Sequence, residues 1–165
     1  MGIRDDMPLL ARHEGVWDGT YRHYDSTGKL VDEHGSRVVC RFPDEGAHAY
    51  VQTNQFSWTD GREVTRDLPA FWRDGRLWYD TDQIIGWATE LPMDDSGRTM
   101  VLYWQYRADP GLYVYEMIQL SDCGKKRSRT WQWIRDGEIE ARTAIDEKLV
   151  TRDWRRLDGK IKKAA

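Results

Sequence analysis

The side chains best suited to acid–base chemistry are two histidines and one glutamate. His23 and His34 fall on the inward parity of strand-like segments, and an imidazole exchanges a proton near neutral pH. Glu116 shares the parity of the apolar Val114 and Ile118, so its carboxylate either points inward or is a solvated charge. A buried carboxylate without a cation has a raised pKa. His23, His34 and Glu116 are therefore the catalytic candidates, with Glu116 open between the two orientations.

Metal binding has less support in the sequence than proton transfer. His23, His34 and His48 share the inward parity, and three imidazoles can hold Zn²⁺. They lie on separate predicted strands, however, and form no local pair such as His-x-His. The chain also lacks glycine-rich phosphate loops and a Gly-x-Ser-x-Gly turn. We therefore expect no metal and no cofactor.

A second set of side chains mixes aromatic rings with amides, as a ligand-binding wall does. Gln52 and Asn54 share one parity with Tyr50 and Phe56, although either face of this strand and of the later strands can be the inward one. In a packed core an unpaired inward amide costs about 1–3 kcal/mol, whereas a wet or ligand-filled cavity removes that cost. The candidate ligand contacts are Tyr21, His23, Tyr50, Gln52, Asn54, Phe56, Trp104, Trp131 and Trp133.

Short turns must position these side chains. Nine clusters pair an Asp with a Gly, among them Asp74-Gly75 and Asp136-Gly137, and both residues tolerate the positive φ of tight hairpins. No long 3.6-residue apolar period separates them, and antiparallel strands in sequence order avoid exposed edges by closing. The pattern predicts an all-β, antiparallel up-and-down β-barrel of about ten strands with a short N-terminal helix; a two-sheet sandwich is the alternative. The predicted strands are 15–24, 30–42, 47–58, 62–68, 77–80, 83–91, 99–107, 112–121, 128–135 and 139–150.

Length and charge limit the organisation and the partners. The 165 residues divide into a helical lead-in, 1–14, a single barrel domain, 15–157, and a basic tail, 158–165. The net charge is −3 and the body of the chain is acidic, which argues against nucleic acid; no apolar run is long enough to span a membrane. Cys40 and Cys123 are far apart and fit free thiols, so we expect a cytoplasmic protein. A homodimer is possible.

The segment from Leu10 to Tyr21 resembles the first strand of the calycins, the superfamily of lipocalins and fatty-acid-binding proteins. The shared element is Gly15-x-Trp17 after a short lead-in helix. The resemblance implies that Trp17 plugs the closed end of the barrel. It also implies that an arginine packs over this ring, for which the candidates are Arg142, Arg152 and Arg155.

Within that superfamily the chain is most similar to bacterial lipocalin-like domains of unknown function. These share a Gln-x-Asn segment before a Trp-x-Asp-Gly turn, matched by Gln52-Thr53-Asn54 and by Trp58-Thr59-Asp60-Gly61. The haem-binding branch uses a C-terminal histidine, whereas all four histidines here precede Ala49. The resemblance thus implies a fold and a pocket, and no reaction.

The sequence supports three hypotheses of function. The first is a lipocalin-like barrel that binds a small hydrophobic or aromatic ligand in its interior. The second is a cofactor-independent isomerase, cyclase or lyase that uses the same pocket with a His or Glu as acid or base. The third is an interaction module with a filled core. Whether the protein is an enzyme stays open.

Overall fold

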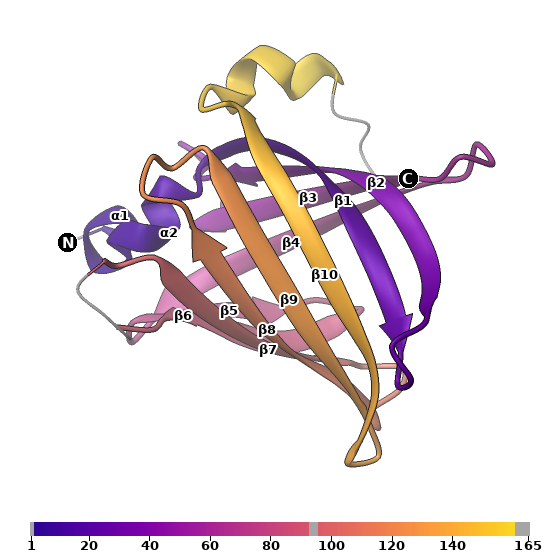
Figure 1. Ribbon diagram of the computed structural model, residues 1–165. Helices are drawn as coiled ribbons and strands as arrows, with labels where there is room; N and C mark the ends of the chain where they lie inside the picture. Colours follow the sequence, from indigo (N-terminus) through magenta and orange to yellow (C-terminus); the bar gives the residue numbers. More distant parts are fainter. Residues whose placement is uncertain (1, 93–95, 161–165) are drawn as a thin grey trace.

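A computed structural model describes residues 2–92 and 96–160 of the chain. Ten antiparallel strands form one closed barrel in which each strand pairs with its neighbours in sequence and β1 pairs with β10 (Figure 1). The predicted up-and-down barrel is confirmed, and the sandwich is wrong. The strands are β1 (Gly15–Asp25), β2 (Leu30–Arg41), β3 (Tyr50–Ser57), β4 (Glu63–Arg73), β5 (Arg76–Asp80), β6 (Ile84–Glu90), β7 (Thr99–Tyr106), β8 (Leu112–Leu120), β9 (Lys126–Arg135) and β10 (Glu138–Thr151).

Two short helices, α1 (Ile3–Asp6) and α2 (Pro8–Arg12), lie at one end of the barrel (Figure 1). Leu9 and Leu10 of α2 are buried in the same apolar cluster as Trp17 at the start of β1. The helices therefore close this end. A 3₁₀ helix, η1 (Trp154–Lys160), follows β10. The predicted basic tail comprises residues 158–165. Residues 161–165 and the side chains of residues 158–160 lie outside the described part of the chain.

Several of the Asp–Gly clusters form hairpin turns as the sequence predicts, whereas Asp158 and Gly159 lie in η1, and Asp94 and Asp95 are outside the described residues. At the β4–β5 turn, Asp74 and Gly75 have φ angles of 53° and 69°, and at the β9–β10 turn Asp136 and Gly137 have 50° and 90°. Two successive positive φ angles match the right-handed twist of the flanking strands. The third strand is shorter at its start than predicted: it begins at Tyr50, and His48 lies exposed in the loop before it.

Strand register places four polar side chains of the interior and one tryptophan in one row. His23 on β1 is the Cα partner of Asp32 on β2 and of Thr143 on β10. Thr143 in turn is opposite Trp131 on β9, which is opposite Glu116 on β8. Because side chains alternate between the two faces of a strand, residues paired in this way point to the same side. One row of partners thus brings these five residues to the barrel interior.

Trp17 lies at the closed end, as the calycin resemblance implies. Its indole Nε1 donates to the carbonyl of His13 at 2.9 Å, and the ring is fully buried. The guanidinium carbon of Arg127 lies 4.5 Å from the ring centroid and that of Arg152 lies 5.8 Å from it. Arg152 was among the three expected arginines, whereas Arg127 is a contact that the resemblance did not indicate.

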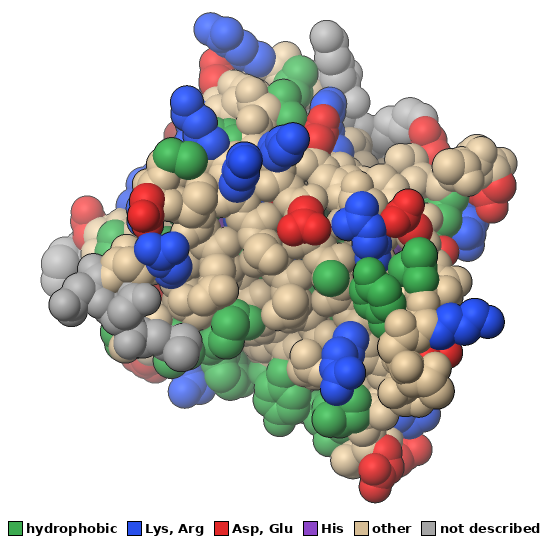
Figure 2. All heavy atoms as spheres, viewed as in Figure 1, with side chains coloured by type: hydrophobic (Ala, Val, Ile, Leu, Met, Phe, Trp, Pro, Cys, Tyr) green, Lys and Arg blue, Asp and Glu red, His purple; other side chains and the backbone are tan. Residues whose placement is uncertain are grey.

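The outer face of the barrel also carries aromatic rings. Trp87, Tyr103 and Tyr115 are cross-strand partners on β6, β7 and β8, and the ring centroids of Tyr103 and Tyr115 are 5.3 Å apart. Hydrophobic side chains gather along the lower edge of the molecule in Figure 2, over the region where Figure 1 labels β7 and β8. The aromatic content of the chain is therefore divided between the interior and this outer surface.

Candidate functional site

A cavity of about 230 Å³ lies inside the barrel, at the end away from the helices. Much of its wall comes from the later residues of β1, β3, β7 and β9 and from His34 in the first half of β2, which antiparallel pairing brings to the same end. The walls are mainly aromatic, and several rings meet edge to face, as Trp104 and Trp131 do at 5.5 Å. The rings that line it are Tyr21, Phe56, Trp58, Tyr79, Trp104, Tyr106, Trp131 and Trp133.

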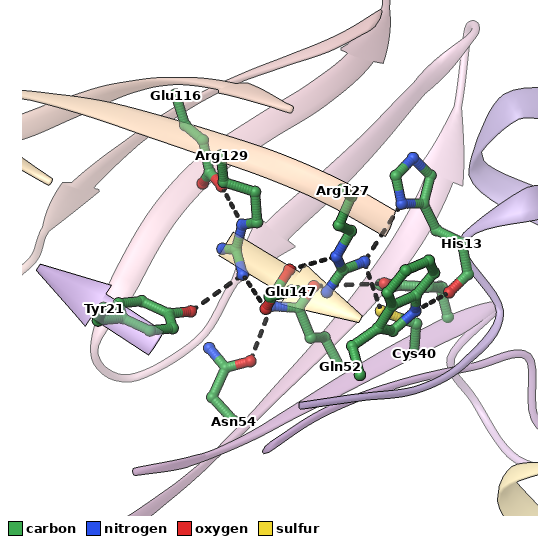
Figure 3. A network of polar contacts seen from close by, with 11 residues as sticks. His13, Tyr21, Cys40, Gln52, Asn54, Glu116, Arg127, Arg129 and Glu147 are labelled. Atoms are coloured by element: carbon green, nitrogen blue, oxygen red, sulfur yellow. Dashed lines mark hydrogen bonds and ion pairs between the residues drawn. The ribbon is translucent and has the colours of Figure 1, made fainter. Parts of the chain in front are cut away.

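One side of the cavity is an ion pair. Arg129 Nε donates to Glu116 at 2.6 Å, and Arg129 Nη1 donates to the Tyr21 hydroxyl at 2.9 Å and to Glu147 at 3.3 Å (Figure 3). Arg129 and Glu116 are 3% and 4% exposed. Glu116 therefore points inward, which settles the orientation that the sequence left open, and its charge is matched by a guanidinium.

The ion pair continues toward the closed end as a buried network. Glu147 also accepts from Arg127 Nε, and Arg127 Nη1 donates to His13 Nδ1 at 3.2 Å (Figure 3). Burial opposes ionisation of Glu147, yet Arg127 and Arg129 outweigh it and lower the pKa of this carboxyl. Burial, followed by the positive charges of Arg127 and Arg129, holds the pKa of His13 well below its usual value, so the ring is neutral.

Two histidines and an aspartate meet at the outer end of the cavity. His34 Nδ1 lies 2.7 Å from Asp32 Oδ2, and His23 Nε2 lies 4.0 Å from the same oxygen. The His23 and His34 rings stack with centroids 5.4 Å apart. The Asp32 and His23 side chains are 37% and 22% exposed, so this group borders solvent while His34 is buried.

Each member of this group has a further polar partner or packing contact. His23 Nδ1 lies 2.7 Å from the Thr143 hydroxyl, Asp32 Oδ1 accepts from Trp58 Nε1 at 3.0 Å, and the His34 ring stacks on Tyr21 at 5.1 Å. Burial and the nearby His34 lower the pKa of His23. Partial burial opposes ionisation of Asp32, but hydrogen bonds from His34 and Trp58 lower the pKa of its carboxyl.

Most residues that the sequence proposed as ligand contacts line this cavity. The structure places Tyr50 elsewhere: it is buried in the apolar cluster beside Phe42, and its hydroxyl donates to Gln52 Oε1 at 3.3 Å. Gln52 Nε2 in turn donates to Asn54 Oδ1 at 2.9 Å. The predicted ligand contacts that lie on the cavity wall are Tyr21, His23, Gln52, Asn54, Phe56, Trp104, Trp131 and Trp133, and the catalytic candidates His34 and Glu116 lie there too.

Sequence reasoning missed the groups that hold these side chains. Asp32 stands two residues before His34 on the same strand face, so the Asp-x-His pattern is the local signal for this contact. Arg127 and Arg129 share the parity of Trp131 and Trp133, but two inward arginines are unexpected before their partners are known. Thr143 carries no signal of its own, because only register places its hydroxyl beside His23.

The closed ten-stranded antiparallel barrel, with Trp17 buried at one end and an internal cavity, fits a calycin-like fold. Solved structures agree with this class. An S-type phycobiliprotein lyase, CPES, from Guillardia theta is similar with a TM-score of 0.66 and 16% identity, over 92% of this chain and 94% of that one. A protein of unknown function of the DUF3598 family from Nostoc punctiforme has a TM-score of 0.61 and 17% identity, over 86% of this chain. Our chain spans about half, 49%, of that protein's length.

At these identities the likeness concerns the fold. No protein-family model matches the sequence, and no curated protein matches it. Within the described residues, none of the helices has the length and apolar character needed to span a membrane.

Proposed function

We propose that the barrel binds a small, planar aromatic or hydrophobic molecule in the cavity between β1, β3, β7 and β9. The observation that carries the proposal is the cavity itself, about 230 Å³ in volume and walled by aromatic rings. A dry cavity of about 150 Å³ is large enough to hold benzene, so this one has room for a fused bicyclic ring.

The polar groups of the wall favour a ligand with one uncharged polar substituent. The charges of Arg129 and Glu116 neutralise each other, so the wall offers no unmatched charge from this pair. Trp131 Nε1 is buried and has no hydrogen-bond partner within the described part of the chain. An acceptor on the ligand would satisfy this N–H, and the side chain of Asn54, whose Oδ1 is occupied by Gln52, retains its N–H₂ group as a second donor.

The proposal is tested by calorimetric titration of the full chain with 2-naphthol, and with indole and laurate for comparison. Leu102 lines the cavity, whereas Val101 precedes it on β7 and points outward. We expect Leu102→Phe to weaken 2-naphthol binding at least tenfold and Val101→Phe to leave it unchanged. The proposal would be contradicted if none of the three compounds bound saturably, or if the Leu102→Phe and Val101→Phe variants bound 2-naphthol with equal affinity.

The enzyme hypothesis uses the same cavity and rests on the contact between Asp32 and His34. A carboxylate that accepts from Nδ1 of a histidine orients the ring and leaves Nε2 to exchange a proton. Glu116 is a weaker acid–base candidate than the sequence indicated, because Arg129 binds its carboxylate. Chemical analysis of the compound recovered after the titration distinguishes the two hypotheses. A chemical change that His34→Gln abolishes supports catalysis, and an unchanged compound supports binding alone.

The expectations of a cytoplasmic location and of a homodimer remain part of the proposal. Cys40 is buried and Cys123 is exposed, and both thiols are free, as a reducing compartment would keep them. The oligomeric state is measurable by sedimentation of the full chain.

A further inference from the structure

We propose that His23, Asp32 and His34 form a site for one divalent transition-metal ion, such as Zn²⁺, at the outer end of the cavity. One donor atom from each residue lies within 4.8 Å of the other two. This group borders the aromatic wall at its solvent end, and none of its three residues bonds to the buried network of Arg127, Arg129, Glu116 and Glu147. The site goes beyond the proposed binding of an apolar ligand, and it can be tested with a metal ion alone.

The measured distances between donor atoms lie on either side of the distance expected between two ligand atoms of a bound ion. Asp32 Oδ2 is 2.7 Å from His34 Nδ1 and 4.0 Å from His23 Nε2. In a tetrahedral zinc site with bonds of about 2.0–2.1 Å, neighbouring ligand atoms are about 3.4 Å apart. Small side-chain rotations of His23 and Asp32 therefore bring the three atoms to coordinating positions, with Zn²⁺ in place of the proton between His34 and Asp32.

In Asp32 and His23, the atoms that do not face the site have hydrogen bonds that suit metal ligands. Trp58 Nε1 donates to Asp32 Oδ1 at 3.0 Å, which leaves Oδ2 for the ion. The Thr143 hydroxyl lies 2.7 Å from His23 Nδ1 and accepts from Trp133 Nε1 at 2.8 Å. A proton on Nδ1 directed at Thr143 leaves the Nε2 lone pair free, and ligating histidines are usually oriented through their second nitrogen in this way.

The backbone also brings these residues together. His23 and Asp32 are Cα partners, and the register between β1 and β2 shifts immediately after His23, so that Tyr24 pairs with Leu30. A bulge of this kind changes the direction of nearby side chains and is common beside functional sites. The sequence argument against a metal was the lack of a local histidine pair, but strand pairing supplies the proximity that the sequence does not display.

The donor set indicates the class of ion. Two imidazoles and one carboxylate suit zinc and other first-row divalent ions, whereas magnesium and calcium prefer all-oxygen sites. Three protein ligands leave a position open in a four-coordinate site, and His23 and His34 both line the cavity. The open position would therefore accept water or a donor atom from the cavity side.

The test is metal binding by the tag-free full chain, measured as Zn²⁺ competition with a chromophoric chelator and as the visible absorption of bound Co²⁺. We expect one ion per chain and at least tenfold weaker binding in His23→Gln and in Asp32→Asn. His48→Gln is the matched control, because His48 is an exposed histidine outside the site, and its affinity should equal that of the parent chain.

A second pair of variants tests the orienting role of Thr143 without removing a ligand. Loss of such a hydrogen bond costs about 10–100-fold in metal affinity, so we expect this loss in Thr143→Val and retained affinity in Thr143→Ser. Thermal unfolding of each variant without metal checks that it folds. The absence of stoichiometric binding by the parent chain, or equal affinities of the His23→Gln and His48→Gln variants, would overturn the proposal.

Discussion

Replacing Glu147 by Gln tests whether charge balance holds the barrel interior together. Glu147 is 2% exposed and accepts from Arg127 and from Arg129. The substitution keeps the shape of the side chain but removes its charge, so the two arginines are left with Glu116 as their one anionic partner in the network. The amide also turns an N–H₂ group toward a guanidinium, which has only donors to offer.

The magnitude follows from burial of the whole network. Breaking a buried ion pair by removing one partner costs about 3–5 kcal/mol, because the remaining charge is not solvated. For a chain of this size each kcal/mol lowers the melting temperature by about 2–4 °C, so Glu147→Gln should lower it by about 6–20 °C.

Asp146 provides a matched control one residue away. Its side chain is 73% exposed, and its Oδ2 lies 3.5 Å from Arg22 Nη1. Exposed ion pairs of this kind contribute about 0–1 kcal/mol to the free energy of unfolding. We expect Asp146→Asn to lower the free energy of unfolding by no more than that, measured by chemical denaturation followed by circular dichroism. Equal losses in the two variants would refute the reasoning, because buried and exposed carboxylates would then contribute alike.

Two further predictions concern pH and the close approach of neighbouring strands. The pKa of His13 is lower in the folded chain than its value of about 6.5 in the unfolded chain. Below about pH 6.5 the unfolded chain therefore binds a proton at His13 that the folded chain does not. The free energy of unfolding then falls by up to about 1.4 kcal/mol for each unit by which the pH decreases. His13→Asn should therefore make the free energy of unfolding vary less with pH between pH 6.5 and 5. An unchanged variation with pH would show that His13 is not its cause. A Cβ at Gly86 would lie 2.2 Å from the Tyr103 carbonyl oxygen and 2.6 Å from Trp104 Cα, so Gly86→Ala should destabilise the barrel by about 1–3 kcal/mol. Gly35→Ala, whose Cβ would meet Ser57 Oγ at 3.2 Å, should cost less; the reverse order in denaturation midpoints would contradict this account of Gly86.

The architecture could be predicted because it depends on local signals. The Asp–Gly turns require positive φ, and the alternation after each turn determines which side chains share a face. From these signals follow the number of strands, the burial of Tyr21 and Trp131, and the closed barrel. The beginning of β3 was misplaced because His48 continues the alternation although the chain is still in a loop.

The polar interior could not be predicted in the same way. Alternation shows that Arg127 and Arg129 share a face with Trp131, but inward arginines become plausible only when Glu116 and Glu147 are known to lie beside them. These partners come from β8 and β10, and their contact depends on register rather than on any local pattern. His23, Asp32 and Thr143 illustrate the same limit, since three different strands supply them.

The position of a bound aromatic molecule tests the account most directly. We propose measuring intermolecular nuclear Overhauser effects between 2-naphthol and the assigned aromatic protons of the protein. The account predicts contacts to Tyr21, Trp104 and Trp131, which line the cavity. Contacts confined to Tyr103 and Tyr115 on the outer face of the barrel would contradict it.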